Sequence, residues 1–339
     1  MKIFVSIISY RDPLLALTIN SLLKNKSNNH EITIGIFEQT AIKDSLVITN
    51  PLLLNNTNIR YKRIDPEFSD GVGWARHINC LQVKDEDFIY QIDSHMLFEQ
   101  DWDNYLVDDW TLGKEKHNTN KIIITGNCKN FDLDETGVPI LHYSDLNVTC
   151  KGKYFLWQHH DIVAAHGEQI EATADIEPAI HIFAGNFFTH TSWLKDVGID
   201  ANIYFDGEEL LMVLSSFAAG YHLYHPRSIH CYHYTKTGEY LTKQWYKPII
   251  PMERYSQLTT AGQEYWQAYV NSLDRSILEK YYEYSGVDYI NKKIDERAMT
   301  YQITVSAPIE ETPIEVLAPI EELPTPESIS SIEKFLQED

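Results

Sequence analysis

An aspartate and a histidine, separated by one residue, follow a short apolar run in the segment 88–95 of this chain. The apolar run is typical of a buried strand. Because ligands of open α/β sheets bind beyond the carboxyl ends of the strands, Asp93 and His95 lie where a ligand is expected. A carboxylate and an imidazole can share one divalent cation, and oxygen-rich surroundings favour Mn²⁺ or Mg²⁺. The pattern therefore predicts a cation that could hold a diphosphate, although such tripeptides also occur at ordinary strand ends.

A glycine-rich turn begins a second candidate group, in the segment 70–77. Glycines allow close backbone approach and helix N-termini attract anions, so the segment predicts a helix that begins near an anion. Arg76 lies in the first turns of this helix, where it could pair with a phosphate or hold a carboxylate near the cation. The spacing fits neither a dinucleotide fingerprint nor a P-loop. A turn with a surface arginine is the simpler alternative.

Two further groups lie in the second half of the chain. The run Asp206-Gly207-Glu208-Glu209 precedes a helical pattern. Its acids either cap the helix, which the helix dipole favours, or bind sugar hydroxyls and act as a base. A histidine-rich run follows a short strand pattern and contains His222, His225, His230 and His233. This density indicates a metal ligand among them, although not all four can be ligands and zinc-finger spacing is absent.

These groups need a scaffold that brings them together. In the first third of the chain, strand patterns at 3–9, 31–37, 58–64 and 88–92 alternate with helical patterns at 13–24 and 71–83. This alternation predicts an α/β fold with a mostly parallel central sheet flanked by helices. Further strands are expected at 121–126, 181–189 and 221–224, and helices at 206–219 and 262–298. The segment 130–180 is expected to form long loops over the sheet.

Composition narrows the classes of function. The chain has 339 residues, of which 43% are hydrophobic and 12% aromatic, as in globular proteins. A formal net charge of -21 disfavours nonspecific nucleic-acid binding, but not an anionic ligand held by a metal. We find neither a signal peptide nor an apolar stretch long enough to span a membrane, which predicts a cytoplasmic protein without a membrane partner. The four cysteines are far apart and are expected to be reduced thiols.

The composition changes from about residue 303. The sequence Ala-Pro-Ile-Glu-Glu occurs at 307–311 and again at 318–322, among further prolines and acids. Such a composition predicts an extended, disordered tail. Residues 328–337 could form a short helix that docks a partner, and a solvated tail is the simpler alternative.

The groups occur in one order: a Gly-rich Ala-Arg helix start, Asp-x-His, Ala-Gly-x-Phe-Phe, and Gly-Glu-Glu followed by Gly-Tyr, a proline and a late histidine. Over about residues 1–240 this order resembles the GlcNAc-transferase family typified by the Skp1 hydroxyproline N-acetylglucosaminyltransferases, and more distantly the polypeptide GalNAc-transferases. The resemblance implies a GT-A fold, a UDP-sugar donor with GlcNAc as the expected sugar, Mn²⁺ or Mg²⁺, and retention of anomeric configuration. It implies a catalytic domain at 1–240 and a helical, acceptor-side extension at 241–300, before the acidic tail at 301–339.

The resemblance also implies a role for each group. Asp93 and His95 would bind the metal, and His233 would complete its shell, with His230 as the alternative. Arg76 would lie near the diphosphate, and Glu208 and Glu209 at the junction of sugar and acceptor, with Glu208 as the candidate for the contact at the reacting face of the sugar. The remaining donor contacts would be Ser9, Tyr10, Arg11 and Asp12 at the nucleotide base, and Ala184, Gly185, Asn186 and Phe187 at the sugar.

The sequence does not identify the acceptor. Segments 130–180 and 240–300 carry no motif that identifies it, so a hydroxyl of a protein, a glycan, a small molecule or a hydroxymethylated DNA base is possible, the last disfavoured by the net charge. A non-catalytic module that binds sugar or protein is the alternative of another class. A nucleotidylyltransferase is disfavoured because the segment 9–13 lacks the glycine-rich loop with lysine that usually follows the first strand.

Overall fold

The structure is a computed structural model of the chain and describes residues 1–142, 148–235 and 248–300. These residues belong to one compact unit, residues 1–309. The expected boundary near residue 240 and the acidic tail with its terminal helix lie outside the described residues. Within the described ranges, no helix is both long and apolar enough to cross a membrane.

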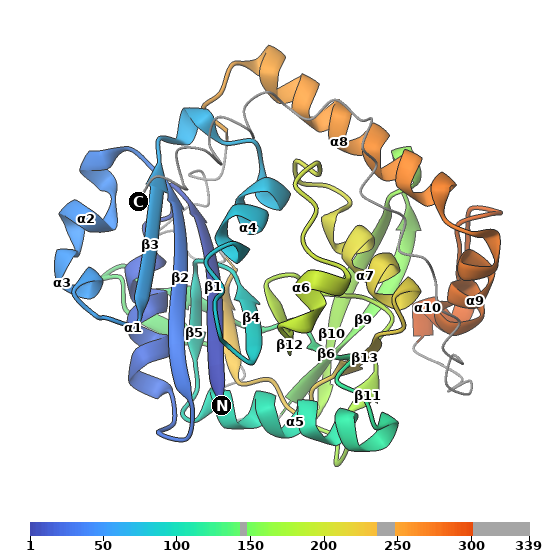
Figure 1. The fold of residues 1–339 in the computed structure, drawn as a ribbon, viewed down its shortest axis with the longest axis horizontal. Helices are drawn as coiled ribbons and strands as arrows, with labels where there is room; N and C mark the ends of the chain where they lie inside the picture. The colour runs from blue at the N-terminus through green and yellow to red at the C-terminus, as the bar shows by residue number, and fades with distance from the viewer. Residues whose placement is uncertain (143–147, 236–247, 301–339) are drawn as a thin grey trace. The chain divides into compact units, whose positions relative to one another are not determined.

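A mixed sheet of eight strands forms the centre of the described part of the chain (Figure 1). Its strands are β1 (Lys2–Tyr10), β2 (Glu31–Gln39), β3 (Ile59–Ile64), β4 (Phe88–Ile92), β6 (Ile122–Thr125), β11 (Glu177–Pro178), β12 (Asn186–His190) and β13 (His222–His225). They lie in the order β11-β13-β6-β12-β4-β1-β2-β3. Strands β1 to β4 are parallel, as are β6 and β13, whereas β12 runs antiparallel between β4 and β6. The predicted α/β fold with a central sheet is therefore confirmed.

Helices cover both faces of this sheet. Successive side chains of a strand point to opposite faces, so apolar strands need cover on both sides. On one face, α1 (Leu15–Asn25) and α5 (Trp102–His117) pack over a core that includes Ile122 and Ile124. On the other face lie α4 (Val72–Cys80), α6 (Ser192–Asp196) and α7 (Glu208–Ala218) (Figure 1). There Ile123 joins the core formed with α7. Both layers are needed because the central strands, such as β1 and β4, are buried on two sides.

A second, smaller sheet lies beyond the carboxyl end of β4. It consists of β5 (Met96–Phe98), β14 (Cys231–Tyr234), β7 (Lys129–Leu133) and β8 (Pro139–Leu141), in that order. Strand β14 pairs antiparallel with β5, so that His233 lies opposite Met96. Cys128 and Cys231 lie at the same end of this sheet with their sulfur atoms 3.2 Å apart, and the four cysteines of the chain, all described, are free thiols.

The segment 130–180 is not a set of long loops, so that prediction was wrong. Besides β7, β8 and β11 it contains a long antiparallel hairpin of β9 (Val148–Trp157) and β10 (Val163–Glu171), joined through the 3-10 turn η3 (His159–Asp161). The hairpin exposes part of one face, where Lys153 and Glu168 form an ion pair. Polar residues on that face hide the strand pattern in the sequence. The expected strand at 181–189 begins later, at Asn186, because residues 184–185 form a turn.

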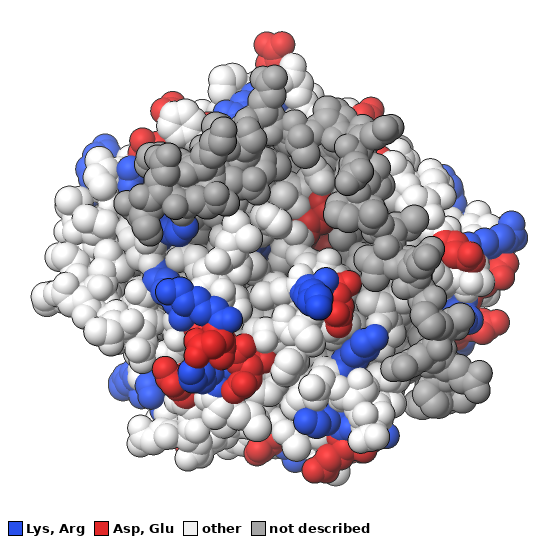
Figure 2. Space-filling model, in the orientation of Figure 1, with Lys and Arg blue, Asp and Glu red and all other residues white. Residues whose placement is uncertain are grey.

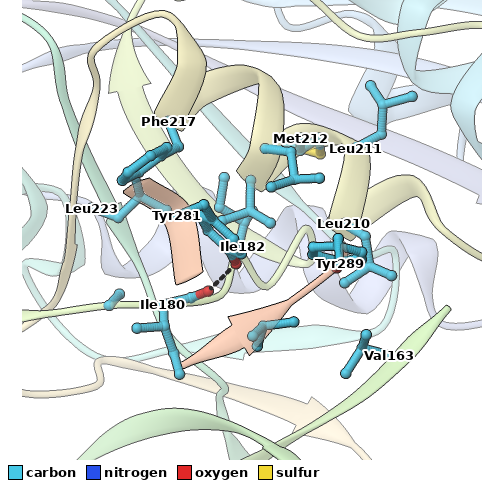
Figure 3. Close-up of a cluster of buried hydrophobic side chains, with 14 of the residues drawn as sticks. Val163, Ile180, Ile182, Leu210, Leu211, Met212, Phe217, Leu223, Tyr281 and Tyr289 are labelled. Carbon is cyan, nitrogen blue, oxygen red and sulfur yellow. Dashed lines mark hydrogen bonds between the residues drawn. The ribbon is translucent and has the colours of Figure 1, made fainter. Parts of the chain in front are cut away.

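The C-terminal part of the described chain packs over α7. It contains α8 (Met252–Ser272), α9 (Arg275–Ser285), β15 (Val287–Asp288), β16 (Lys293–Ile294) and α10 (Glu296–Thr300). Figure 3 shows Tyr281 and Tyr289 among apolar side chains of α7, and the hydroxyl of Tyr281 donates to the carbonyl of Ile180 at 3.0 Å. The remaining short elements are η1 (Ile42–Asp44), α2 (Leu46–Thr49), α3 (Pro51–Leu54) and η2 (Pro66–Phe68).

Candidate functional site

Three potential metal ligands converge at the carboxyl end of β4. Asp93 follows β4, His95 precedes β5, and His233 lies on β14. One ligand atom from each lies within 4.8 Å of the others. Nε2 of His95 is 2.9 Å from Nε2 of His233, which is 3.5 Å from Oδ2 of Asp93. A carboxylate oxygen and two imidazole nitrogens in this arrangement fit a divalent cation.

The carboxylate of Asp93 is held in its ionised form. Burial opposes ionisation, but the hydrogen bond and charge of His233 lower the pKa of Asp93 well below its usual range. The charges of Arg76 and His95 act in the same direction. An ionised carboxylate is the form that binds a cation.

Strand pairing selects His233 among the four histidines of the histidine-rich run. The antiparallel pairing of β14 with β5 brings His233 beside the 93–95 turn, and the amide of Tyr234 donates to the carbonyl of His95 at 3.0 Å. His230 lies elsewhere, since its Nδ1 is 3.0 Å from a carboxylate oxygen of Glu99 and its ring stacks on Tyr105. The structure thus places His233, and not the alternative His230, with Asp93 and His95.

Arg76 links Asp93 to helix α7. Asp93 and the two histidines, His95 and His233, are called the metal-ligand group below. Its Nη2 lies 3.2 Å from Oδ1 of Asp93, and its Nη1 pairs with Oε2 of Glu208. The side chains of Arg76 and Glu208 are 5% and 7% exposed, so the guanidinium is enclosed between the two carboxylates. The sequence allowed Arg76 to pair with a phosphate or to hold a carboxylate. The structure shows the contact with carboxylates.

The glycine-rich start of α4 serves chain packing, so the prediction of an anion at this helix start was wrong. The amides of Val72 and Gly73 donate to the carbonyls of Tyr204 and Ile203, at 2.7 and 3.2 Å. A Cβ on Gly71 would lie 2.3 Å from the carbonyl oxygen of Tyr204. Because the loop before α7 occupies these amides, they are not available to an anion.

The two glutamates at the start of α7 differ in environment. Glu208 is buried against Arg76, whereas the side chain of Glu209 is 42% exposed. Oε1 of Glu209 accepts from the amide of Ala184 at 2.8 Å, and Oε2 lies 3.1 Å from Nε2 of His181. Burial opposes ionisation of Glu209, but the hydrogen bond and charge of His181 lower its pKa. Glu209 is therefore a fixed, ionised carboxylate that a ligand can reach.

The turn at 184–185 lies against Asp93, one of the three potential metal ligands. A Cβ on Gly185 would lie 2.4 Å from Oδ2 of Asp93, so only glycine allows this close approach. Asn186 is buried, and its amide group bonds to the hydroxyl of Tyr90 and the carbonyl of Gly126. The side chain of Phe187 packs in the core. Of the four residues expected at the sugar, Ala184 and Gly185 thus adjoin Glu209 and Asp93, while the side chains of Asn186 and Phe187 serve the fold.

The segment 9–12, at the end of β1 and just beyond it, was expected at the nucleotide base. Ser9 is buried, and its hydroxyl has no hydrogen-bond partner among the described residues. The hydroxyl of Tyr10 accepts from the amide of Ile249 at 3.0 Å, and Arg11 has a left-handed backbone with φ of 53°. Asp12 instead lies behind His95, with Oδ2 2.6 Å from its Nδ1.

Sequence reasoning missed two residues that support the site, His181 and Ser94. His181 holds Glu209 and is in turn bonded to the hydroxyl of Tyr154 at 3.0 Å. Ser94, the middle residue of Asp-x-His, donates to Oδ2 of Asp12 at 2.6 Å. Neither has a motif of its own, although His181 begins the segment that contains Ala184 and Gly185.

Charges on the visible face of the molecule are mixed. Figure 2 shows Lys and Arg side chains interspersed with Asp and Glu, without a continuous basic field on the described part of this face. A nucleic-acid backbone requires such a field.

Comparison with known proteins identifies the family. The sequence profile of the family described as Glycosyltransferase (GlcNAc) matches residues 2–56 and 48–279. The chain belongs to this glycosyltransferase family. No curated protein sequence matches the chain.

Two solved structures superpose on the chain to different extents. The structure of GalNAc-T7 with UDP, GalNAc and Mn²⁺ superposes with a TM-score of 0.55 at 17% identity, covering 88% of this chain and 56% of that one. The structure of residues 1–349 of S. aureus TarS with UDP-GlcNAc gives a TM-score of 0.44 at 14% identity, covering 88% and 83%. The chain thus spans little more than half the length of GalNAc-T7, and this similarity concerns the fold alone.

Proposed function

We propose that the chain is a metal-dependent, retaining glycosyltransferase that moves a sugar, with GlcNAc expected, from a UDP-sugar to an acceptor hydroxyl. Family membership supports sugar transfer. The observation that carries the proposal is the convergence of Asp93, His95 and His233 beside Arg76 and the Glu208–Glu209 pair. GalNAc-T7, which shares the fold, was crystallised with UDP, GalNAc and Mn²⁺, and this supports the donor class and the cation.

Asp93, His95 and His233 would hold the cation. A divalent cation bound there neutralises the negative charge that develops on a departing diphosphate. Around it, Arg76 fixes the orientation of the Asp93 carboxylate, and Gly185 leaves room for its oxygen. The carboxylate is thereby preorganised for binding, which limits the reorganisation needed when a donor arrives.

Glu209 is the carboxylate that we assign to the reacting sugar or its acceptor. It is ionised, partly exposed and held by Ala184 and His181, so its remaining lone pairs can accept a hydrogen bond from a hydroxyl. Glu208, which the sequence had favoured for this contact, is instead enclosed with Arg76 and acts on the reaction through that arginine. The resemblance to retaining enzymes supports retention. Retention of the anomeric configuration requires either a carboxylate nucleophile or attack by the acceptor on the same face of the sugar from which the leaving group departs.

The acceptor that we propose is a hydroxyl on a protein. The resemblance to the Skp1 hydroxyproline family supports this class. The mixed charges of Figure 2 are unfavourable for a DNA acceptor. Docking of a partner through the acidic tail remains part of the proposal.

Donor hydrolysis tests the proposal directly. Purified protein is incubated with a panel of UDP-sugars, with Mn²⁺ or with EDTA, and released UDP is measured. We expect release from one donor, its loss in EDTA and its recovery with Mn²⁺, and a product whose anomeric proton coupling matches that of the donor. Absence of both UDP release and UDP binding for every donor would overturn the proposal in favour of a non-catalytic module.

A further inference from the structure

A buried carboxylate lies directly behind His95. Asp12 follows β1, and its side chain is 1% exposed. Its Oδ2 lies 2.6 Å from Nδ1 of His95 and accepts from the hydroxyl of Ser94 at 2.6 Å. Its Oδ1 accepts from the amide of Leu14 at 2.8 Å. Asp12 is therefore turned into the protein, and a ligand could not reach it without a rearrangement of this turn.

The position of Asp12 determines which nitrogen of His95 carries the proton. A neutral imidazole has one N–H group, and its other nitrogen presents a lone pair. The Asp12 carboxylate already accepts from the amide of Leu14 and the hydroxyl of Ser94, and an ionised carboxylate is an acceptor only, so its 2.6 Å contact with Nδ1 of His95 requires the proton to be on Nδ1. The other ring nitrogen, Nε2, is then unprotonated and faces His233 at 2.9 Å, on the side of Asp93.

The backbone around His95 is fixed from the same side. The hydroxyl of Thr18, on α1, donates to the carbonyl of Ser94 and accepts from the amide of Met96, both at 2.8 Å. The start of α1 and the turn before it thus hold both the ring and the backbone of His95. Such a double constraint leaves the ring little freedom to turn.

We infer that Asp12 is a positioning residue, which fixes the orientation and the tautomer of His95 so that Nε2 carries the lone pair that binds a divalent cation. The inference rests on the proposed function only in taking the Asp93–His95–His233 group as the metal site. It replaces the contact with the nucleotide base that the resemblance implied for Asp12.

The substitution Asp12→Asn tests the inference sharply, because the surroundings dictate how the new amide must lie. The backbone amide of Leu14 is a donor only, so the amide oxygen must take the place of Oδ1. The NH₂ group then takes the place of Oδ2 and faces Nδ1 of His95. That contact favours the opposite tautomer, with a proton on Nε2, where it points toward His233.

The tautomer is read in the metal-free protein. Long-range ¹H–¹⁵N correlation spectra of ¹⁵N-histidine-labelled protein at pH 8.5, where imidazole is largely neutral, distinguish the two tautomers. His95 is assigned by the loss of its signals in His95→Gln. We expect Nδ1–H in the wild type and a shift to Nε2–H in D12N. An Nε2–H tautomer in the wild type overturns the inference, and this holds even if D12N does not fold.

Mn²⁺ affinity is the second readout, measured by electron paramagnetic resonance of free Mn²⁺ without any donor. We expect D12N to bind Mn²⁺ about 10- to 100-fold more weakly, as is typical for loss of a partner that orients a metal ligand. The matched control is Asp132→Asn, which removes the carboxylate partner of a different histidine, His142, outside the group of Asp93, His95 and His233. We expect this variant to stay within about threefold of the wild type.

The outcomes separate this inference from the proposed function. Unchanged Mn²⁺ affinity of D12N, equal losses in both variants, or no Mn²⁺ binding by the wild type overturns the inference. If D12N responds as expected in tautomer and affinity while no UDP-sugar is consumed, the role of Asp12 stands and the proposed sugar transfer fails.

Discussion

Nη2 of Arg76 lies 3.2 Å from Oδ1 of Asp93, and its Nη1 pairs with Glu208. One buried guanidinium thus connects the strand end that carries Asp93 with the start of α7. A buried cation of this kind requires carboxylate partners, because water cannot solvate it. Two carboxylates share one positive charge, and the excess negative charge favours a divalent cation beside Asp93.

Glu208→Gln should destabilise the protein. The substitution leaves Arg76 buried with a weaker partner, and breaking a buried ion pair of this kind costs about 3 kcal/mol in free energy of unfolding. Urea denaturation measures the change. The matched control is Glu279→Gln, which removes an exposed pair with Arg275 and should change stability by less than about 0.5 kcal/mol. Equal effects of the two variants would contradict the role of Glu208.

Glu209→Gln should lower catalysis without loss of metal binding. The substitution keeps the shape of the side chain but removes the charge that we assign to the reacting sugar or acceptor. We expect kcat to fall about 10²- to 10⁴-fold, with Mn²⁺ affinity and thermal stability near those of the wild type. Initial rates with the active donor measure this. Full activity would remove Glu209 from this role.

Asp93→Asn should weaken Mn²⁺ binding because it removes a direct ligand. We expect a loss of affinity greater than the roughly 10- to 100-fold that is typical when a residue hydrogen-bonded to a metal ligand is replaced. Mn²⁺ titration and the rate of UDP release should fall together. Asp132→Asn is the matched control, since Asp132 also pairs with a histidine, His142, but lies outside the metal-ligand group. If both variants lose Mn²⁺ binding to the same extent, the effect is not specific to the site.

Gly185→Ala should displace the carboxylate of Asp93. The added Cβ would lie 2.4 Å from Oδ2, a distance that forces this side chain to move. We expect Mn²⁺ affinity to fall at least about tenfold, as is typical when a metal ligand loses its correct orientation. Gly113→Ala serves as the control, because its Cβ would meet Ile122 in the core and should lower stability without changing Mn²⁺ affinity. An unchanged Mn²⁺ affinity of Gly185→Ala would show that the site tolerates the displacement.

His225 should make stability depend on pH below neutrality. It is 1% exposed, with Nδ1 donating to the carbonyl of Thr125 and Nε2 accepting from the amide of Gly152. Burial lowers the pKa of His225 to about 4, whereas an imidazole in the unfolded chain titrates near pH ~6.5. The unfolded state therefore binds the proton first, so this contribution to stability is complete above pH ~6.5 and is lost as the pH falls to about 4.

The test is urea denaturation between pH ~7 and ~4. We expect His225→Gln to show a weaker dependence of stability on pH than the wild type over this interval, by an amount on the order of 3 kcal/mol. His222, whose pKa is likewise lowered to about 4 by burial and by His117, is present in both proteins and keeps its own contribution to the pH dependence of stability. Identical pH profiles for wild type and His225→Gln would contradict the assignment.

The sequence by itself determined the features that depend on neighbouring residues. The strand before Asp93 follows from an apolar run, and the helix that begins at Glu208 and is followed by Gly220 follows from local pattern and capping. The α/β class follows from the alternation of such elements. Local interactions decide these features, so a single sequence is enough to predict them.

Only the tertiary structure decided which residues meet. His233, which the resemblance had favoured over His230, joins His95 because β14 pairs with β5 across more than a hundred residues of chain, whereas His230 contacts Glu99. Adjacent glutamates on one helix point in different directions, so burial beside Arg76 separates Glu208 from Glu209. Asp12 and His95 are brought together by the parallel pairing of β1 with β4. Contacts between distant segments depend on register and packing, which residue types alone do not specify.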